Sequence, residues 1–315
     1  MQKEFFDRFF VKVRHIDIHS CTTERLIILY KVYSNVFSLI SVYTDLGDNY
    51  GGRSAIRQQA RSVAEILVSR IEKGMTGELE MTCLESLFDY SSQYMDERWD
   101  DLALERSSHL IKKYTGDKAG GREPQMSPDT EASLCNLIGI CFYLVGEAEL
   151  AKAAEGMITG WGNRQARSGE WPGLPVTVSI KRFYAIEAYQ SYTLDLSFGL
   201  LLKKGLGFYL SNIRLPQGNE GPDEEQVQEL IGAADLLLFV KKRQHRQEQL
   251  KQTGALIEQY LKKIDEACGK GNMTPCSEFF SELSLNCMRV LAAWLMECMR
   301  CNPGENKNRE KSVTE

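Results

Sequence analysis

The sequence lacks an excess of positive charge. Its 315 residues include 38 Lys and Arg against 43 Asp and Glu, which gives a formal net charge of −5 and an isoelectric point near 5.6. Proteins that bind nucleic acid usually carry a basic surface, because much of their affinity comes from neutralising phosphate groups. We therefore expect no nucleic acid among the partners of this chain.

Short catalytic motifs are also missing. The chain contains no Gly-x-Ser-x-Gly elbow, no phosphate-binding loop and no dinucleotide fingerprint, and His109 and His245 are isolated. His15, Asp17 and His19 alternate at strand spacing, but no fourth ligand of the kind that zinc requires lies nearby. The sequence predicts no cofactor and no metal site, and it leaves the presence of an enzymatic activity open.

A long uninterrupted apolar run is a third absence. The stretch from Leu26 to Tyr43 approaches the length of a membrane span, yet polar side chains recur along it at helical spacing, at Lys31, Ser34, Asn35, Ser38 and Ser41. The N-terminal segment lacks the basic and apolar regions of a signal peptide. Nine cysteines, an odd number scattered through helical pattern, suit a reducing compartment. We expect a cytoplasmic protein that does not enter the membrane.

Helical periodicity is what the sequence has in abundance. The expected helices cover residues 52–74, 78–95, 98–115, 129–145, 148–160, 178–205, 223–266 with a break, and 276–301. Strand-like alternation occurs around Val11, Val13, Ile16 and Ile18. The sequence predicts an all-α protein. We expect a single helical domain over 1–303, with a possible subdomain break near 215–223, and a disordered tail over 304–315 that has no apolar periodicity.

Two of the expected helices are separated by a tight turn. Gly146 and Glu147 leave room only for a tight turn, so the expected helices 129–145 and 148–160 should form a helical hairpin. The pattern resembles a single tetratricopeptide unit through Ile138, Gly139, Phe142, Gly146 and Ala151. No second copy follows in register, whereas arrays of that family need several units for stability. Generic packing of helical hairpins is the expectation.

The connection after this hairpin contains Gln165, Gly169 and Trp171, which form a Gln-x3-Gly-x-Trp pattern. The pattern resembles the motif that ties successive hairpins together in terpenoid cyclases and related α/α toroids. The resemblance implies that Gln165, Gly169 and Trp171 fasten one hairpin to the next. It also implies the arrangement of an all-α array of antiparallel helical hairpins, either α/α-toroid-like or an irregular α-solenoid.

A second stretch resembles a motif of isoprenoid enzymes. Asp96 to Asp100 is similar to an imperfect Asp-Asp-x-x-Asp, the carboxylate set that binds magnesium diphosphate in class I isoprenoid synthases. Carboxylates at this spacing can present oxygen atoms to a hard cation. A charged cluster at a helix junction is more often a solvated cap, and we take that interpretation.

The expected helix 178–205 is apolar on nearly every side. Its polar line consists of Glu187, Ser191 and Asp195, which follow one another at intervals of one helical turn. This line is either a strip that faces solvent or, in a toroid, the lining of a pocket. In the second case the candidate catalytic residues are Glu187, Asp195 and Glu170, and the candidate ligand-binding residues are Trp171, Arg182 and Tyr184.

Two classes of function follow from these patterns. The first is a non-enzymatic scaffold that binds a protein or peptide, because no segment holds a complete catalytic set. The alternative is an α/α-toroid enzyme or a carbohydrate-binding protein, in which a small-molecule or glycan ligand enters a pocket lined by carboxylates and rimmed by aromatic side chains.

Overall fold

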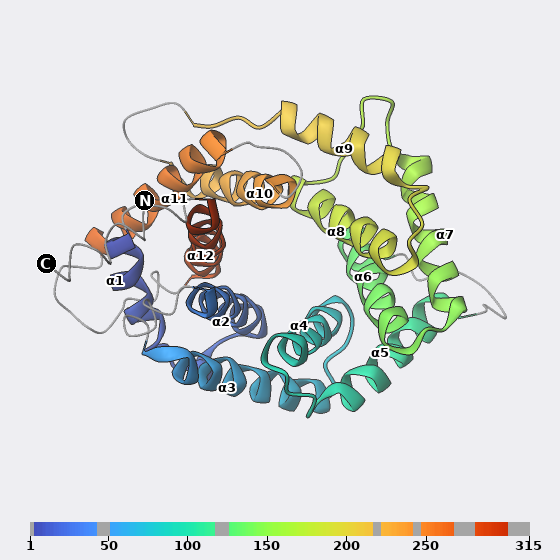
Figure 1. Ribbon diagram of the computed structural model, residues 1–315, viewed down its shortest axis with the longest axis horizontal. Helices are drawn as coiled ribbons and strands as arrows, with labels where there is room; N and C mark the ends of the chain where they lie inside the picture. The colour runs from blue at the N-terminus through green and yellow to red at the C-terminus, as the bar shows by residue number, and fades with distance from the viewer. Residues whose placement is uncertain are drawn as a thin grey trace, which may run out of the picture. The chain divides into compact units, whose positions relative to one another are not determined.

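The computed structural model describes residues 3–42, 51–116, 126–216, 222–241, 247–267 and 281–301 (Figure 1). Within these ranges the chain forms twelve α-helices, one short 3-10 helix and no strand, so the all-α prediction is confirmed. The helices are α1 Lys3–Val13, α2 Thr23–Val42, α3 Gly52–Glu72, α4 Glu78–Tyr94, α5 Asp100–Thr115, α6 Pro128–Val145, α7 Ala148–Arg164, α8 Val176–Thr193, α9 Gly199–Ser211, α10 Glu224–Lys241, α11 Gln247–Ala267 and α12 Glu282–Cys301.

The chain divides into two compact units. Unit 1 contains Met1–Val63 and Pro216–Glu315, and unit 2 contains Ala64–Leu215. One boundary falls at the Gly- and Pro-containing connection near 215–223. The other falls between Val63 and Ala64 inside α3, where an unbroken helical pattern gives no signal in the sequence.

Unit 1 is organised around α12, which packs against both α2 and α10 (Figure 1). The side-chain amide of Asn35 in α2 donates a hydrogen bond to the carbonyl of Arg289 in α12 at 3.1 Å. The Arg289 guanidinium donates to both carboxylate oxygens of Asp235 in α10, at 2.8 and 2.7 Å. A bidentate pair of this kind fixes the orientation of two helices as well as their distance.

Unit 2 contains three antiparallel hairpins, α4/α5, α6/α7 and α8/α9. In the first hairpin Arg106 of α5 donates to the buried Glu80 of α4 at 2.8 Å. In the third, the rings of Phe183 and Tyr209 meet edge to face with centroids 5.9 Å apart. In the second, Trp161 Nε1 of α7 donates to Glu131 of α6 at 3.1 Å. Each hairpin therefore has its own contacts between its two helices.

The first helices of these hairpins, α4, α6 and α8, lie side by side and run in the same direction. At their N-terminal ends, Lys181 of α8 forms ion pairs with Asp129 of α6 and with Glu78 of α4. Near the C-terminal ends of α6 and α8, the rings of Tyr143 and Tyr192 pack with centroids 5.0 Å apart. The three hairpin turns therefore lie at one end of unit 2.

Each of these turns begins with a residue in the left-handed region. The residues are Met95 after α4, with φ 52°, Gly146 after α6, with φ 72°, and Leu194 after α8, with φ 59°. Glycine adopts this conformation without strain, whereas a side chain with a Cβ atom does so at a cost of roughly 1–2 kcal/mol. Met95 and Leu194 are also 86% and 85% exposed. Burial therefore does not explain why apolar side chains occupy these two positions.

The predicted hairpin of 129–145 and 148–160 is confirmed by α6 and α7, although α7 continues to Arg164. The predicted helix 223–266 is described as α10 up to Lys241 and as α11 from Gln247, and its predicted break falls on 242–246, outside the described residues. The described part of the last predicted helix begins at Glu282. The tail at 304–315 lies outside the described residues.

Two predictions about secondary structure are wrong. The strand-like stretch at 11–18 begins inside α1, because Phe6, Phe10 and Val13 are buried at helical spacing and outweigh the local alternation. The single helix 178–205 is two helices. Asp195 interrupts it by accepting hydrogen bonds from the backbone N–H and the hydroxyl of Ser197, at 2.8 and 3.0 Å. This turn contains no Gly or Pro before Gly199, so the apolar pattern concealed it.

The described helices were also compared with the length and hydropathy of membrane spans. None of them combines the two properties that crossing a bilayer requires. The polar stripe of α2 remains partly accessible while Leu26, Leu29 and Tyr30 are buried.

The left-handed conformation of Leu194 generates a stability prediction. We expect Leu194→Gly to raise the free energy of unfolding by about 0.5–1 kcal/mol, because relief of strain exceeds the entropy that glycine adds to the unfolded chain. Urea unfolding of the full chain, followed by circular dichroism, measures the change. Ser191→Gly is the matched control on the same helix, and we expect it to destabilise by about 0.5 kcal/mol. Equal destabilisation by both substitutions would contradict the assigned strain.

Candidate functional site

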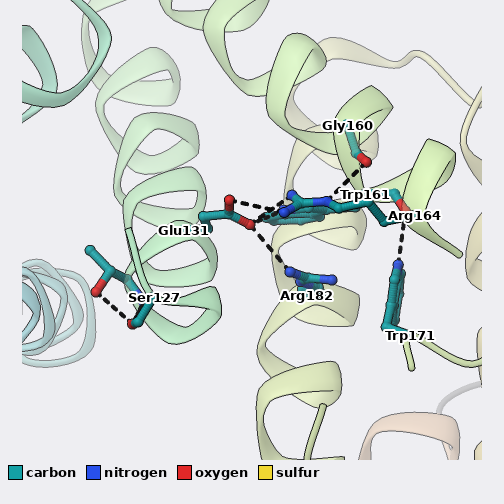
Figure 2. Close-up of polar contacts among 8 residues, drawn as sticks. Ser127, Glu131, Gly160, Trp161, Arg164, Trp171 and Arg182 are labelled. Carbon is teal, nitrogen blue, oxygen red and sulfur yellow. Dashed lines mark hydrogen bonds and ion pairs between the residues drawn. The ribbon is translucent and has the colours of Figure 1, made fainter. Parts of the chain in front are cut away.

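The carboxylate of Glu131, in the first turn of α6, connects several polar side chains of unit 2. The helix begins locally because Ser127 accepts a hydrogen bond from the backbone N–H of Thr130 at 3.0 Å and Pro128 occupies the first helical position. Glu131 Oε2 accepts from Trp161 Nε1 at 3.1 Å, from Arg164 at 2.8 Å and from Arg182 at 3.2 Å. Figure 2 shows this carboxylate facing all three donors.

Arg182 is the buried charged residue of this cluster, with 2% of its surface exposed. Its guanidinium carbon lies 5.0 Å from the ring centroid of Trp161 and 5.2 Å from that of Trp171, a distance at which cation–π attraction is effective. Burial lowers the pKa of Arg182 to about 10, an effect that the charge of Glu131 opposes. The guanidinium therefore remains protonated at neutral pH. Two indole rings and one carboxylate replace part of its hydration, while its buried Nε has no hydrogen-bond partner among the described residues.

The motif residues Gln165, Gly169 and Trp171 lie in the connection between α7 and α8. Trp171 is buried, and its indole N–H donates to the carbonyl of Trp161 at 2.9 Å (Figure 2). The Gln165 amide donates to the carbonyl of Gly169 at 2.9 Å and to that of Leu201 in α9 at 3.2 Å. These contacts connect the α6/α7 hairpin to the α8/α9 hairpin.

Gly169 is placed where no other residue fits. Its φ is 105°, and a Cβ atom there would lie 2.2 Å from the carbonyl oxygen of Lys204 in α9. The loop therefore approaches the backbone of α9 directly, which requires a residue without a side chain.

The other predicted site residues occupy different settings. Glu187 is half-buried on α8, and Tyr184 is exposed on the same helix. Asp195 is outside the helix, because α8 ends at Thr193. The predicted polar line at intervals of one turn therefore stops at Ser191, which corrects the geometry on which the pairing of Glu187 with Asp195 depended. Glu170 is half-buried in the loop, where its carbonyl accepts from the N–H of Ala166 at 2.8 Å.

The ionisation of Asp195 follows from its position in the turn. The backbone N–H and the hydroxyl of Ser197 hold the pKa of the Asp195 carboxyl below its usual range. A carboxyl group that donates a proton in glycoside hydrolysis needs the opposite shift, because it must be protonated near neutral pH. The environment of Asp195 favours a carboxylate that caps a turn.

The segment from Asp96 to Asp100 forms the turn between α4 and α5. Asp96 accepts from Arg98 Nε at 2.7 Å and from the hydroxyl of Tyr90 at 3.2 Å. Asp100 accepts from the hydroxyl of Ser91 at 2.9 Å. These two carboxylates therefore accept hydrogen bonds from within the α4/α5 hairpin. Among the described residues, no group of three or more His, Cys, Asp or Glu side chains is arranged to hold a metal ion.

Sequence reasoning missed Glu131, Trp161 and Arg164. Arg182 was the available signal, because a charged side chain within an apolar stretch of helix needs a partner. The partners could not be identified in this way, since Glu131 precedes Arg182 by 51 residues and no local spacing relates them.

A second candidate site is the end of unit 2 that carries the three hairpin turns. It combines seven exposed apolar side chains at the C-terminal ends of α4, α6 and α8 and in the first turn of α9. We call this set the hairpin-turn surface; it consists of Met95, Tyr143, Leu144, Val145, Leu194, Leu196 and Leu200.

Comparisons with known proteins do not assign a family to either site. Models of known protein families and the sequences of curated proteins give no match to this chain. The resemblance to α/α toroids stays a prediction, and a function has to be argued from the two sites themselves.

The Glu131 cluster generates a prediction about stability. We expect Glu131→Gln to lower the free energy of unfolding by about 3 kcal/mol, because it leaves the charge of Arg182 buried without a carboxylate. Urea unfolding of the full chain measures the loss. Glu149→Gln is the matched control, since Glu149 pairs with Lys152 on the surface and is 82% exposed; we expect a change of about 0.5 kcal/mol or less. A similar small effect of both substitutions would show that the cluster does not hold the hairpins.

The pKa of Asp195 generates a second prediction. Because the pKa is lowered in the folded state, its contribution to stability is present above the unfolded pKa of about 3.9 and is lost as the pH falls through the folded value. Carbon-detected NMR titration, with Asp195→Asn used to assign the resonance, should give a pKa below about 3.9. A value near neutrality would instead restore Asp195 as a candidate general acid.

Proposed function

We propose that this protein is a non-enzymatic helical scaffold that binds a protein or peptide segment through the hairpin-turn surface. The observation that carries the proposal is the gathering of exposed apolar side chains at one end of unit 2, around Tyr143, Leu194 and Leu196. Exposed apolar side chains gathered at one end of a unit are a common property of protein interaction sites, because their removal from water favours association.

The backbone at Leu194 and Met95 supports the same interpretation. Each side chain is exposed and each residue is in a conformation that favours glycine. An exposed leucine at such a position contributes little to the folded core and adds strain to the turn. A partner that covers Leu194 and Met95 would explain why apolar side chains occupy these two positions.

The alternative is an α/α-toroid enzyme or a carbohydrate-binding protein. It has less support, because Glu187 and Asp195 do not share a helix and the pKa of Asp195 is lowered. Arg182 and Trp171 are buried against Glu131 and Trp161, which makes them contacts between hairpins. Closure of the helices around a central cavity, the arrangement that this alternative needs, stays a prediction.

The proposal includes a location in the cytoplasm. Cys135, Cys141 and Cys287 are buried with free thiols. Burial raises the pKa of Cys135 to about 12, so this thiol behaves as a small apolar side chain. Free thiols of this kind suit a reducing compartment.

Site-specific crosslinking tests the proposed surface. A photoreactive amino acid at position 196 in the full chain should crosslink to defined proteins in a cell extract, and the same residue at position 105 of α5 serves as the control in unit 2. We expect the crosslinks from position 196 to disappear when Leu194 and Leu200 are replaced by serine, while circular dichroism remains unchanged. Identical crosslinking from both positions, or insensitivity to the serine substitutions, would overturn the proposal.

A further inference from the structure

The charge around the hairpin-turn surface indicates what kind of segment binds there. We infer, on the basis of the proposed function, that the partner is a short peptide segment that combines apolar side chains with Lys or Arg.

Acidic residues outnumber basic ones at this end of unit 2. In the turns and their flanks, over residues 95–101, 143–149 and 194–200, Arg98 is the one basic residue in the sequence. The acidic residues in the same ranges are Asp96, Glu97, Asp100, Asp101, Glu147, Glu149 and Asp195. Just beyond these ranges, Lys152 pairs with Glu149 at 2.9 Å, and Lys203 and Lys204 follow in α9. The turns themselves therefore carry more acidic than basic side chains.

The single basic residue is already paired. Arg98 Nε donates to Asp96 at 2.7 Å, and the Arg98 guanidinium also lies over the ring of Trp99 at 5.4 Å from its centroid. Glu97, Asp101 and Glu147 are exposed. A segment that approaches Leu194 or Tyr143 therefore meets carboxylates at the edge of the apolar area.

Helix stability accounts for some of these carboxylates. Asp100, Asp101 and Glu149 lie in the first turns of α5 and α7, where negative charge stabilises the helix N-terminus. This role does not remove the charge of these carboxylates. The electrostatic potential that a partner meets is the sum of the contributions of all charged groups near the surface. Lysine or arginine beside the apolar residues of the partner would complement that potential.

The same charge argues against a lipid surface as the occupant. Exposed leucines in turns can also insert into a bilayer, but biological membrane surfaces are commonly anionic and attract basic segments. An apolar surface edged by Glu97, Asp101 and Glu147 would be repelled from such lipids. A basic peptide segment satisfies both the apolar and the charged parts of the surface.

Binding of synthetic peptides to the full chain tests the inference. The probes are three fluorescein-labelled peptides of equal length: one with Leu and Lys at helical spacing, one with Glu in place of Lys, and one with Ser in place of Leu. Fluorescence anisotropy should show saturable binding of the Leu/Lys peptide, with binding of the other two weaker by about tenfold or more. Raising the salt concentration should weaken the Leu/Lys complex.

Matched variants locate the bound peptide. Replacing Leu194, Leu196 and Leu200 together by serine should weaken binding of the Leu/Lys peptide about tenfold or more. Glu97→Gln with Glu147→Gln should weaken it about threefold to tenfold. The control pair is Glu72→Gln with Glu105→Gln, which removes two exposed carboxylates of unit 2 outside the hairpin turns and should leave the affinity unchanged.

Leu194→Gly separates binding from folding. The substitution relieves backbone strain, so it should stabilise the protein while it weakens peptide binding. Substitution of a residue that serves only the fold would not raise stability and weaken peptide binding together. Stabilisation without any loss of affinity would remove Leu194 from the docking surface.

The outcomes distinguish this inference from the proposed function. Equal binding of the Leu/Glu peptide, or insensitivity to the Glu97 and Glu147 substitutions, would overturn the charge preference and leave the scaffold proposal standing. Failure of all three peptides to bind, or equal binding by the triple serine variant, would overturn both. Sedimentation with phosphatidylcholine and phosphatidylserine vesicles, abolished by the triple substitution, would replace the peptide by a lipid surface.

Discussion

The interaction on which unit 2 depends is the one between the Glu131 carboxylate and the Arg182 guanidinium. A buried charge needs other groups in place of its lost hydration, and here one carboxylate and the faces of Trp161 and Trp171 supply part of that replacement. Glu131 comes from the start of α6, Trp161 from the end of α7 and Arg182 from the start of α8. The contacts of this one cation therefore link two successive hairpins.

The same arrangement determines what is left at the opposite ends of α6 and α8. Because the two helices are held in parallel at their N-terminal ends, their C-terminal turns are brought to one face, where Tyr143 meets Tyr192. The exposed apolar residues around Tyr143 and Leu194 then lie at the same end of unit 2 although they are far apart in the sequence. The scaffold proposal and the inferred basic partner both rest on that juxtaposition.

Prediction from the sequence succeeded where local signals were strong and failed where they were weak. The α6/α7 hairpin was predictable, since Gly146 interrupts two clear helical patterns. The break after α8 was not, because Leu194 adopts a glycine-like conformation and Asp195 and Ser197 make the turn inside an apolar stretch. Trp171 was identified as a fastener by resemblance, and its contact with the Trp161 carbonyl became visible only in three dimensions.

The sequence by itself determined that the chain is helical, because apolar periodicity and capping residues act over a few positions. The tertiary structure decided which charges are buried together and which apolar side chains remain in water. Both depend on contacts between residues tens of positions apart, such as Glu131 with Arg182. Helical spacing restricts which side of a helix a residue occupies, but it does not specify the helix that it faces.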